Sequence, residues 1–471
     1  MKTTTKNSPL GASFRDPSGF LFTRDGVLYR QVNQVYAADY DRLMTSGLYA
    51  KLVETGRLIP HEESDQKPAA PNAYKILRPE RVPFISYPYE WSFGQLKDAA
   101  LATLSIQKRA LKYGVSLKDA SAYNIQFFKG KAALIDSLSF ESYQEGEPWV
   151  AYRQFCQHFL APLALMAYRD VRLVQLLRVY IDGIPLDLAS ELLPSRTRWN
   201  LGLASHIHLH AQAQKKYSGA SIAEQRRGRK MSQEALLGLI ESLQNTVRKL
   251  AWKPAGTEWG EYYDQTNYSV AAFEHKKQLV AEWAGRVKPR LVWDLGANTG
   301  IFTRQALRLG SGQAMGPERY AVAWDIDPAA VEQNWMQVRK EKEQAILPLV
   351  LDLTNPSPAL GWDNRERESF GQRGPADLIL ALALIHHLAI SNNLPFERIA
   401  ESMAGWGKWL VIEFVPKSDS QVQKLLRSRK DIFDEYTRQG FEAAFERQFE
   451  IVERRAVRES ERWMYLMRKS V

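Results

Sequence analysis

The sequence contains a single cysteine, Cys156, among its 471 residues. One cysteine excludes an internal disulfide, an all-cysteine zinc site and an iron–sulfur cluster held by this chain alone. Long apolar runs are lacking too, because the two longest, 159–167 and 378–385, fall far below the ~20 residues that a membrane span requires. The polar amino terminus has no apolar h-region, so we expect residues 1–15 to be a flexible tail and the protein to be cytoplasmic.

The composition is that of a globular protein with more than one domain. Hydrophobic residues make up 45% and charged residues 25%, which is enough apolar surface for sizeable cores. Because domains cluster at about 100 to 200 residues, a chain of this length favours two or three. The residue pattern changes near position 200 and again near 256. We therefore expect an α+β domain at 16–200, a basic helical linker at 201–255 and an α/β domain at 256–471.

The net charge of +10 is concentrated in one stretch, because the region after 256 is nearly balanced. Our first interpretation of this stretch is a solvated linker, and the alternative is an arm that binds the phosphates of a nucleic acid. Its basic residues are Lys215, Lys216, Arg226, Arg227, Arg229, Lys230, Arg248, Lys249 and Lys253.

Two local patterns organise the amino-terminal half. Short apolar runs on either side of Asp25-Gly26 predict a β-hairpin. Ser92 with Gln95 three residues later is a capping box, and the apolar residues after it recur at helical spacing. A long amphipathic helix should therefore lead into Gly114.

After Pro289 the pattern alternates between strands and helices. Continuous apolar strands separated by helices indicate a parallel sheet with helices on both faces. The last two expected strands are joined by a turn and should form an antiparallel edge. The strands are expected at 290–294, 320–325, 346–351, 377–385, 409–414, 449–457 and 462–468.

The first of these strands ends in Asp-Leu-Gly-Ala-Asn-Thr-Gly at 294–300, which resembles the first motif of class I S-adenosylmethionine (SAM)-dependent methyltransferases. Tyr320–Asp325 resembles the second strand of that family, 349–353 its third motif and 377–387 its fourth. The resemblance covers 256–471 and implies a seven-stranded Rossmann-like sheet with SAM at the carboxyl ends of its strands. The cofactor-binding residues that it implies are Asp294, Gly296, Asn298, Gly300, Asp325, Asp352 and Leu353.

A nicotinamide dinucleotide is the competing ligand, since it also uses an acidic residue after the second strand. The glycines here are spaced G-x-x-x-G rather than G-x-G-x-x-G, which favours SAM. The aromatic segment 257–268 precedes the first strand, and in many family members such a segment closes over the cofactor. We expect Tyr263, Asn267 and Tyr268 to touch SAM or the acceptor, with a plain helix packed on the sheet as the alternative.

Methyl transfer requires removal of a proton from the acceptor, and imidazole titrates near neutral pH. His386 and His387 at the end of the fourth strand are therefore the candidate bases, and Glu413 at the end of the fifth should reach the same mouth. The D/N-P-P-aromatic signature of amino-group methylation on adenine, cytosine or glutamine is missing. We expect an O or N acceptor on a small or carrier-bound molecule, and no metal.

The segment from Leu117 to Asp136 resembles the catalytic core of protein-kinase-like and aminoglycoside-phosphotransferase-like enzymes. The resemblance implies that Asp119 is a base and that Asn124 and Asp136 are Mg²⁺ ligands for bound ATP. The sequence departs from that family at Leu117, where His is usual, and Ser137-Leu138 replaces Phe-Gly. A glycine-rich loop is missing, and Arg30 stands nearest to the usual lysine position.

The leading hypothesis is therefore a methyltransferase with a degenerate kinase-like accessory domain. A bifunctional phosphotransferase and methyltransferase is the second hypothesis. A non-catalytic scaffold that binds SAM or RNA is the third. The sequence does not indicate an oligomeric state.

Overall fold

The computed structural model describes residues 9–212, 231–254, 269–307, 319–427 and 429–470. The chain divides into two compact units. Unit 1 comprises residues 1–253 and 359–367, and unit 2 comprises 254–358 and 368–471. Each unit combines helices with strands, so the predicted mixture of α and β structure is confirmed.

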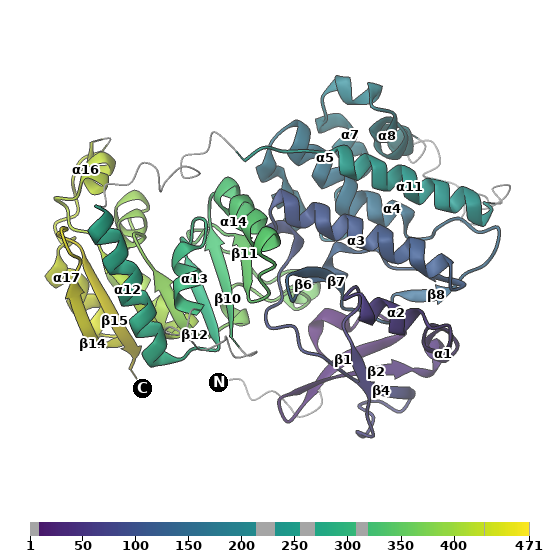
Figure 1. Cartoon of the computed structure of the whole chain (residues 1–471), viewed down its shortest axis with the longest axis horizontal. Coiled ribbons are helices and arrows are strands. Elements are labelled where there is room, and N and C mark those ends of the chain that lie inside the picture. Colours follow the sequence, from purple (N-terminus) through teal and green to yellow (C-terminus); the bar gives the residue numbers. More distant parts are fainter. Residues whose placement is uncertain (1–8, 213–230, 255–268, 308–318, 428, 471) are drawn as a thin grey trace. The chain divides into compact units, whose positions relative to one another are not determined.

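Unit 1 contains a four-stranded antiparallel sheet in the order β1-β2-β4-β3, drawn in purple in Figure 1. The predicted hairpin is confirmed, because Asp25 and Gly26 both have positive φ, as a tight two-residue turn requires. The strands are β1 (Gly19–Arg24), β2 (Val27–Asn33), β3 (His61–Glu63) and β4 (Ala73–Pro79), with helices α1 (Ala37–Thr45) and α2 (Leu48–Glu54).

The rest of unit 1 is mainly helical and is built around α3 (Phe93–Leu111). The predicted capping box is present, because the Ser92 hydroxyl accepts from the Gln95 N–H and the Gln95 side chain accepts from the Ser92 N–H. Loops connect the strands of two short antiparallel pairs. These pairs are β5 (Val115–Leu117) with β8 (Phe140–Ser142), and β6 (Ile125–Phe128) with β7 (Lys131–Leu134). The other helices include α4 (Tyr152–Phe155), α5 (Ala161–Tyr168), α6 (Leu176–Val179), α7 (Leu186–Leu192) and α8 (Leu201–Leu203).

The structure differs from the expected linker at 201–255. Helix α11 (Gln233–Lys249) belongs to unit 1 and packs against α3. Its buried side chains Leu236, Ile240, Leu243 and Val247 recur at helical spacing, which makes an apolar stripe. The sequence interpretation gave the charges more weight than this stripe. Of the expected basic arm, residues 213–230 lie outside the described part of the chain.

A second difference concerns residues 359–367, which were expected in the carboxy-terminal domain. Within unit 1, both the Nε and Nη2 atoms of Arg15 donate to the Glu366 carboxylate, at 2.9 and 2.5 Å. The Arg367 guanidinium lies 4.3 Å from the centre of the Tyr123 ring. These contacts join residues far apart in the sequence, so local patterns could not predict them.

Unit 2 is built on a seven-stranded sheet in the order β11-β10-β9-β12-β13-β15-β14. Strand β15 is antiparallel to both of its neighbours, whereas the pairings among the other strands are parallel. All seven predicted strands are present, as β9 (Leu291–Leu295), β10 (Tyr320–Asp325), β11 (Ile346–Val350), β12 (Ala376–Ala381), β13 (Gly407–Phe414), β14 (Phe449–Ala456) and β15 (Trp463–Lys469).

The strand order reverses direction between β9 and β12. Connections from β9 through β10 to β11 run one way along the sheet, and the connection from β12 to β13 runs the other way. In open α/β sheets with such a reversal, ligands bind outside the carboxyl ends of the strands on either side of it, which here are β9 and β12. The helices, some labelled in Figure 1, are α12 (Val270–Val287), α13 (Ile301–Leu307), α14 (Pro328–Glu341), α15 (Phe396–Trp406), α16 (Ser420–Leu426) and α17 (Arg438–Glu446).

None of the helices in the described ranges combines the length and apolar character needed to cross a membrane.

The capping box predicts a measurable contribution to the stability of unit 1. Replacing Ser92 by Ala leaves the Gln95 N–H without its side-chain acceptor, so the free energy of unfolding should fall by about 1 kcal/mol. Chemical denaturation of the full chain measures this change. Ser105→Ala, in the middle of the same helix, is the matched control and should be neutral or slightly stabilising because Ala has the higher helix propensity. Equal effects from both substitutions would contradict the capping role.

Candidate functional site

The loop after β9 has a backbone that suits close approach of a ligand. Gly296, Asn298 and Gly300 all have positive φ, at 79°, 51° and 78°. The N–H groups of Gly296 and Ala297 donate to the Trp324 carbonyl on β10, at 2.9 and 2.8 Å. A Cβ atom on Gly300 would come within 2.6 Å of the Asn334 side chain. Both the dihedral angle and the space therefore require glycine at 300.

Asp325, the last residue of β10, connects this loop to the next one. Its carboxylate accepts from the Asn298 N–H at 2.7 Å and from the Asp327 N–H at 2.9 Å. Burial raises the pKa of Asp325 to about 6, although these backbone donors act in the opposite direction. Each carboxylate oxygen has two lone pairs, so acceptor capacity remains for hydroxyl groups of a ligand.

Asp294 lies on the adjacent strand and is only 2% exposed. Its carboxylate accepts from the Thr303 hydroxyl on α13 at 2.6 Å. Burial raises the pKa of Asp294 to about 7, and the nearby charge of Asp325 adds to the effect. The side chain therefore stands close to its titration point at neutral pH.

Asp352 and Leu353 follow β11, the third strand along this edge. The Leu351 N–H donates to the Asp325 backbone carbonyl at 2.8 Å, which fixes the start of this loop beside β10. Asp352 is partly exposed and accepts from the N–H and the hydroxyl of Thr354, at 2.8 and 2.6 Å. Asp294, Asp325 and Asp352 therefore lie at the carboxyl ends of three adjacent parallel strands.

Arg304 holds the glycine loop in place and was missed in the sequence interpretation. Its Nη1 atom donates to the carbonyls of Thr299 and Gly300 and to the Asn334 side chain. Its Nε and Nη2 atoms donate to the Glu343 carboxylate, at 2.9 and 2.6 Å. No sequence signal distinguishes this arginine from a solvated one, because its partners come from α14 and the segment after it.

His386 and His387 lie beyond the carboxyl end of β12, where a short helical segment begins. The sequence interpretation placed them at the strand end, but β12 ends at Ala381 and the chain turns at Ala383, which has positive φ. His386 is 2% exposed, and its Nδ1 has no hydrogen-bond partner among the described residues. Burial lowers the pKa of His386 well below its usual 6.5, aided by the charges of His387, Arg462 and Lys276.

Glu413 is fully buried at the end of β13 and holds the turn before the histidines. Its Oε2 atom accepts from Lys276 Nζ and from the Ala383 N–H, both at 2.8 Å. Arg462 lies 3.7 Å from the other carboxylate oxygen and also donates to Asp419 at 2.7 Å. Lys276 was missed, although a lone lysine on the apolar face of 270–287 was a signal available in the sequence.

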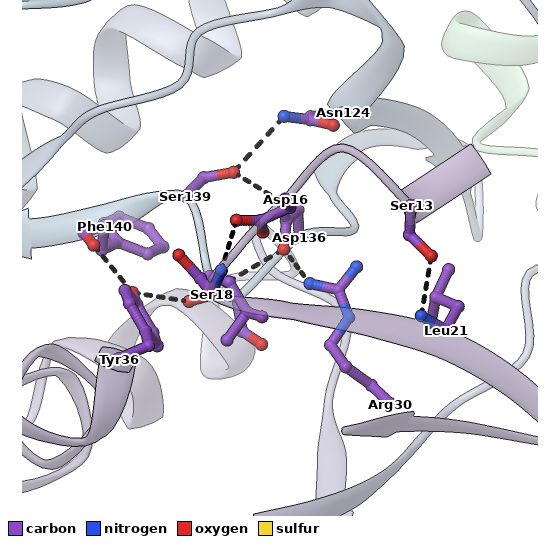
Figure 2. A network of polar contacts seen from close by, with 12 residues as sticks. Ser13, Asp16, Ser18, Leu21, Arg30, Tyr36, Asn124, Asp136, Ser139 and Phe140 are labelled. Carbon is purple, nitrogen blue, oxygen red and sulfur yellow. Dashed lines mark hydrogen bonds and ion pairs between the residues drawn. The ribbon is translucent and has the colours of Figure 1, made fainter. Parts of the chain in front are cut away.

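The three residues singled out in unit 1 do not all contact one another. Asn124 and Asp136 are connected through Ser139, whose hydroxyl donates to Asp136 at 3.0 Å and accepts from the Asn124 amide at 3.3 Å (Figure 2). Asp119 instead accepts from the Ser121 N–H and the Gln154 side chain, at 2.9 and 2.8 Å. Side-chain hydrogen bonds therefore join Asn124 to Asp136 through Ser139, whereas Asp119 reaches Ser139 only through its backbone N–H, which donates to the Ser139 carbonyl at 3.4 Å.

Tyr263, Asn267 and Tyr268 lie outside the described residues, so their expected contacts stay predictions. Within the described ranges, no three His, Cys, Asp or Glu side chains are grouped so that they could hold a metal ion.

The structure defines a mixed α/β protein whose unit 2 has a glycine loop and three aspartates at the carboxyl ends of adjacent parallel strands. No known protein-family profile matches the chain. The chain is 33% identical to the nodulation protein NoeA of Rhizobium meliloti (strain 1021) over 473 residues, which cover 98% of this chain and 96% of that protein. The chain therefore belongs to the family of the nodulation protein NoeA.

Solved structures with partial similarity include a SAM-dependent methyltransferase from Aquifex aeolicus. It shares 15% identity at a TM-score of 0.32, covering 47% of this chain and 100% of that protein. The bifunctional kinase-methyltransferase WbdD shares 15% identity at a TM-score of 0.28, covering 48% of this chain and 45% of that protein. At these TM-scores neither likeness carries a functional conclusion.

The raised pKa of Asp294 predicts that this carboxylate destabilises unit 2 at neutral pH. The unfolded chain ionises Asp294 near its usual pKa of 3.8, whereas the folded chain keeps the proton up to about 7. Stability is therefore lost as the pH rises through this window. Asp294→Asn should raise the melting temperature at pH 8, because the free energy of unfolding should increase by up to roughly 4 kcal/mol. The gain should shrink as the pH falls toward 4.

Asp377→Asn is the control of opposite sign. Asp377 accepts from the Arg290 and Leu291 N–H groups at the amino ends of the strands. Burial acts to raise its pKa, but the Lys408 contact and these donors outweigh burial and lower it. Its replacement should lower the melting temperature at pH 8. A loss of stability from Asp294→Asn at every pH would contradict the assignment of a penalised buried carboxylate.

Proposed function

We propose that unit 2 is a SAM-dependent methyltransferase domain. The observation that carries the proposal is the row of carboxylates at the ends of β9, β10 and β11 beside a loop with three positive φ angles. Open α/β sheets bind ligands at this edge, next to the point where the strand order reverses. Under this proposal Asp325 accepts the ribose hydroxyls, and Asp352 with Leu353 faces the adenine.

The charge balance of the site supports a cationic ligand. Asp294 and Asp325 are both buried, and neither forms an ion pair with a cationic side chain in the described ranges. The Lys276 charge opposes the raised pKa of Asp294, but Lys276 is ion-paired with Glu413 and the pKa of both aspartates stays raised, so a positive charge arriving nearby would stabilise their ionised forms. Bound SAM would supply an electrophilic methyl group on a sulfonium, which carries such a charge. A nicotinamide dinucleotide has a positive ring only in its oxidised form and carries two negative charges on its pyrophosphate in both forms, which favours SAM between the two candidates.

His386 is the proposed base that removes the acceptor's proton. Because the pKa of His386 is lowered, its imidazole is neutral at physiological pH and free to accept a proton at once. Glu413 acts under this proposal as a positioning residue, since its contact with the Ala383 N–H fixes the turn that leads to the histidine. The acceptor is an O or N atom of a small or carrier-bound molecule.

Unit 1 is proposed to be an accessory module of degenerate kinase-like type. The proposal rests on the resemblance of 117–136 together with the hydrogen bonds that connect Asn124, Ser139 and Asp136. The contacts of the Asp119 carboxylate with Ser121 and Gln154 suit a residue that shapes its loop.

The cofactor assignment predicts that SAM binding depends on the Asp325 carboxylate. Isothermal titration of SAM into the full chain should show at least about tenfold weaker binding for Asp325→Asn, because a charge-assisted hydrogen bond contributes about 1.5–3 kcal/mol. Asp377→Asn is the matched control. The Asp325 and Asp377 carboxylates each accept from two backbone N–H groups, but they lie at opposite ends of the strands of one sheet. Equal SAM affinity in wild type and Asp325→Asn would remove the site assignment.

The base assignment predicts a difference between the two adjacent histidines. A deletion strain should lack at least one methylated product in untargeted metabolite profiling, and wild type should restore it. Complementation with His386→Gln should leave the product strongly reduced, because a general base contributes about 10²–10⁴-fold to the rate. His387→Gln is the control and should restore the product. Full restoration by His386→Gln would exclude His386 as the base, and an unchanged profile in the deletion strain would count against methyl transfer itself.

A further inference from the structure

Asp136 in unit 1 already has a positively charged partner. Arg30 extends from β2 toward Asp136, two residues beyond the end of β7, and forms an ion pair with its carboxylate (Figure 2). Only 12% of the Arg30 side chain and 15% of the Asp136 side chain are exposed. The pair is therefore largely shielded from water, where an ion pair is screened least.

Two further acceptor positions of the Asp136 carboxylate are occupied as well. Its Oδ1 atom also accepts from the Leu138 N–H at 2.9 Å, and its Oδ2 atom accepts from the Ser139 hydroxyl at 3.0 Å. Ser139 in turn accepts from the Asn124 amide. This contact uses the Nδ2 atom of Asn124, so the Oδ1 atom is the only part of that side chain that could bind a metal ion.

Other charged and polar side chains also lie near Arg30. The pKa of Arg30 is lowered to about 10 by burial, while Asp16 and Tyr36 act in the opposite direction, so the guanidinium stays charged at neutral pH. Lys118 adds a second cation, with its Nζ 4.5 Å from the Tyr36 ring centre and 3.2 Å from the Ser18 hydroxyl.

A divalent cation does not fit this arrangement. Mg²⁺ requires about six oxygen ligands at roughly 2.1 Å in near-octahedral geometry. The carboxylate that would bind it is shared among Arg30, Leu138 and Ser139. The adjacent guanidinium would repel a second cation, and this repulsion is strongest where water is excluded. The Mg²⁺ and ATP expectation for Asp119, Asn124 and Asp136 therefore disagrees with the structure.

We propose that the Arg30 guanidinium is the resident cation of Asp136 and occupies the position that a divalent metal would otherwise take. Unit 1 then binds no Mg²⁺ at Asp136 and Asn124 and is not a metal-dependent phosphotransferase. The latent metal site is opened only when the guanidinium is removed. This inference is independent of the methyltransferase proposal for unit 2.

The test measures binding of Mn²⁺, a spectroscopic substitute that favours the same oxygen ligands as Mg²⁺. Free Mn²⁺ is measured by electron paramagnetic resonance during titration into the full chain. Wild type and Asp136→Asn should bind equal amounts. Arg30→Met removes the charge at similar length and should bind one more Mn²⁺ per chain than wild type. The double variant Arg30→Met/Asp136→Asn should lose this gain.

Arg30→Lys is the matched control, because it keeps a cation beside Asp136 and should gain no Mn²⁺. Wild type that binds one Mn²⁺ more than Asp136→Asn would overturn the proposal. A folded Arg30→Met that gains no Mn²⁺ would also overturn it, because the guanidinium would then not occupy a metal position. Circular dichroism monitors folding, and the comparison of wild type with Asp136→Asn decides the question if Arg30→Met fails to fold.

Discussion

The contact between Asp325 and the Asn298 N–H is the constraint on which the candidate cofactor site depends. It ties the loop after β9 to the end of β10, so two loops that approach from neighbouring strands share one carboxylate. The positive φ of Asn298 turns its N–H toward that acceptor. Arg304 also donates to the carbonyls of the next two residues, Thr299 and Gly300. The loop is shaped before any ligand arrives, which lowers the entropy that binding must overcome.

The strands, the hairpin turn and the helix cap could be predicted from the sequence because they depend on local residue patterns. The capping box at Ser92, the hairpin at Asp25-Gly26 and the seven strands of unit 2 depend on residue type and short spacing. Order along the chain also brings the acidic strand ends to one edge once the sheet is parallel. Local chemistry therefore accounts for the glycine loop and the carboxylates.

The parts that escaped prediction depend on partners distant in sequence. Lys276 and Glu413 are 137 residues apart, and Arg30 and Asp136 are 106 apart. Nothing in a local window distinguishes a buried, paired cation from one in solvent. Glu413 shows the consequence, because it was expected to reach the mouth of the site but is fully buried beneath the turn at Ala383. A helical linker was expected at 201–255, and the membership of helix α11 in unit 1 escaped for a related reason, since its apolar stripe has meaning only against α3.

The two units differ in how their largely buried aspartates are neutralised. In unit 1 the Asp136 carboxylate is neutralised by a cation of the chain itself, and its pair is complete in the folded protein. In unit 2 Asp294 and Asp325 have backbone and hydroxyl donors but no ion-paired partner in the described ranges, and the pKa of each is raised. A buried carboxylate without a counter-ion lowers stability, so a fold tolerates it where a ligand provides the missing charge. The location of uncompensated charge therefore distinguishes the unit proposed to bind a cationic cofactor from the unit whose corresponding charge is already satisfied.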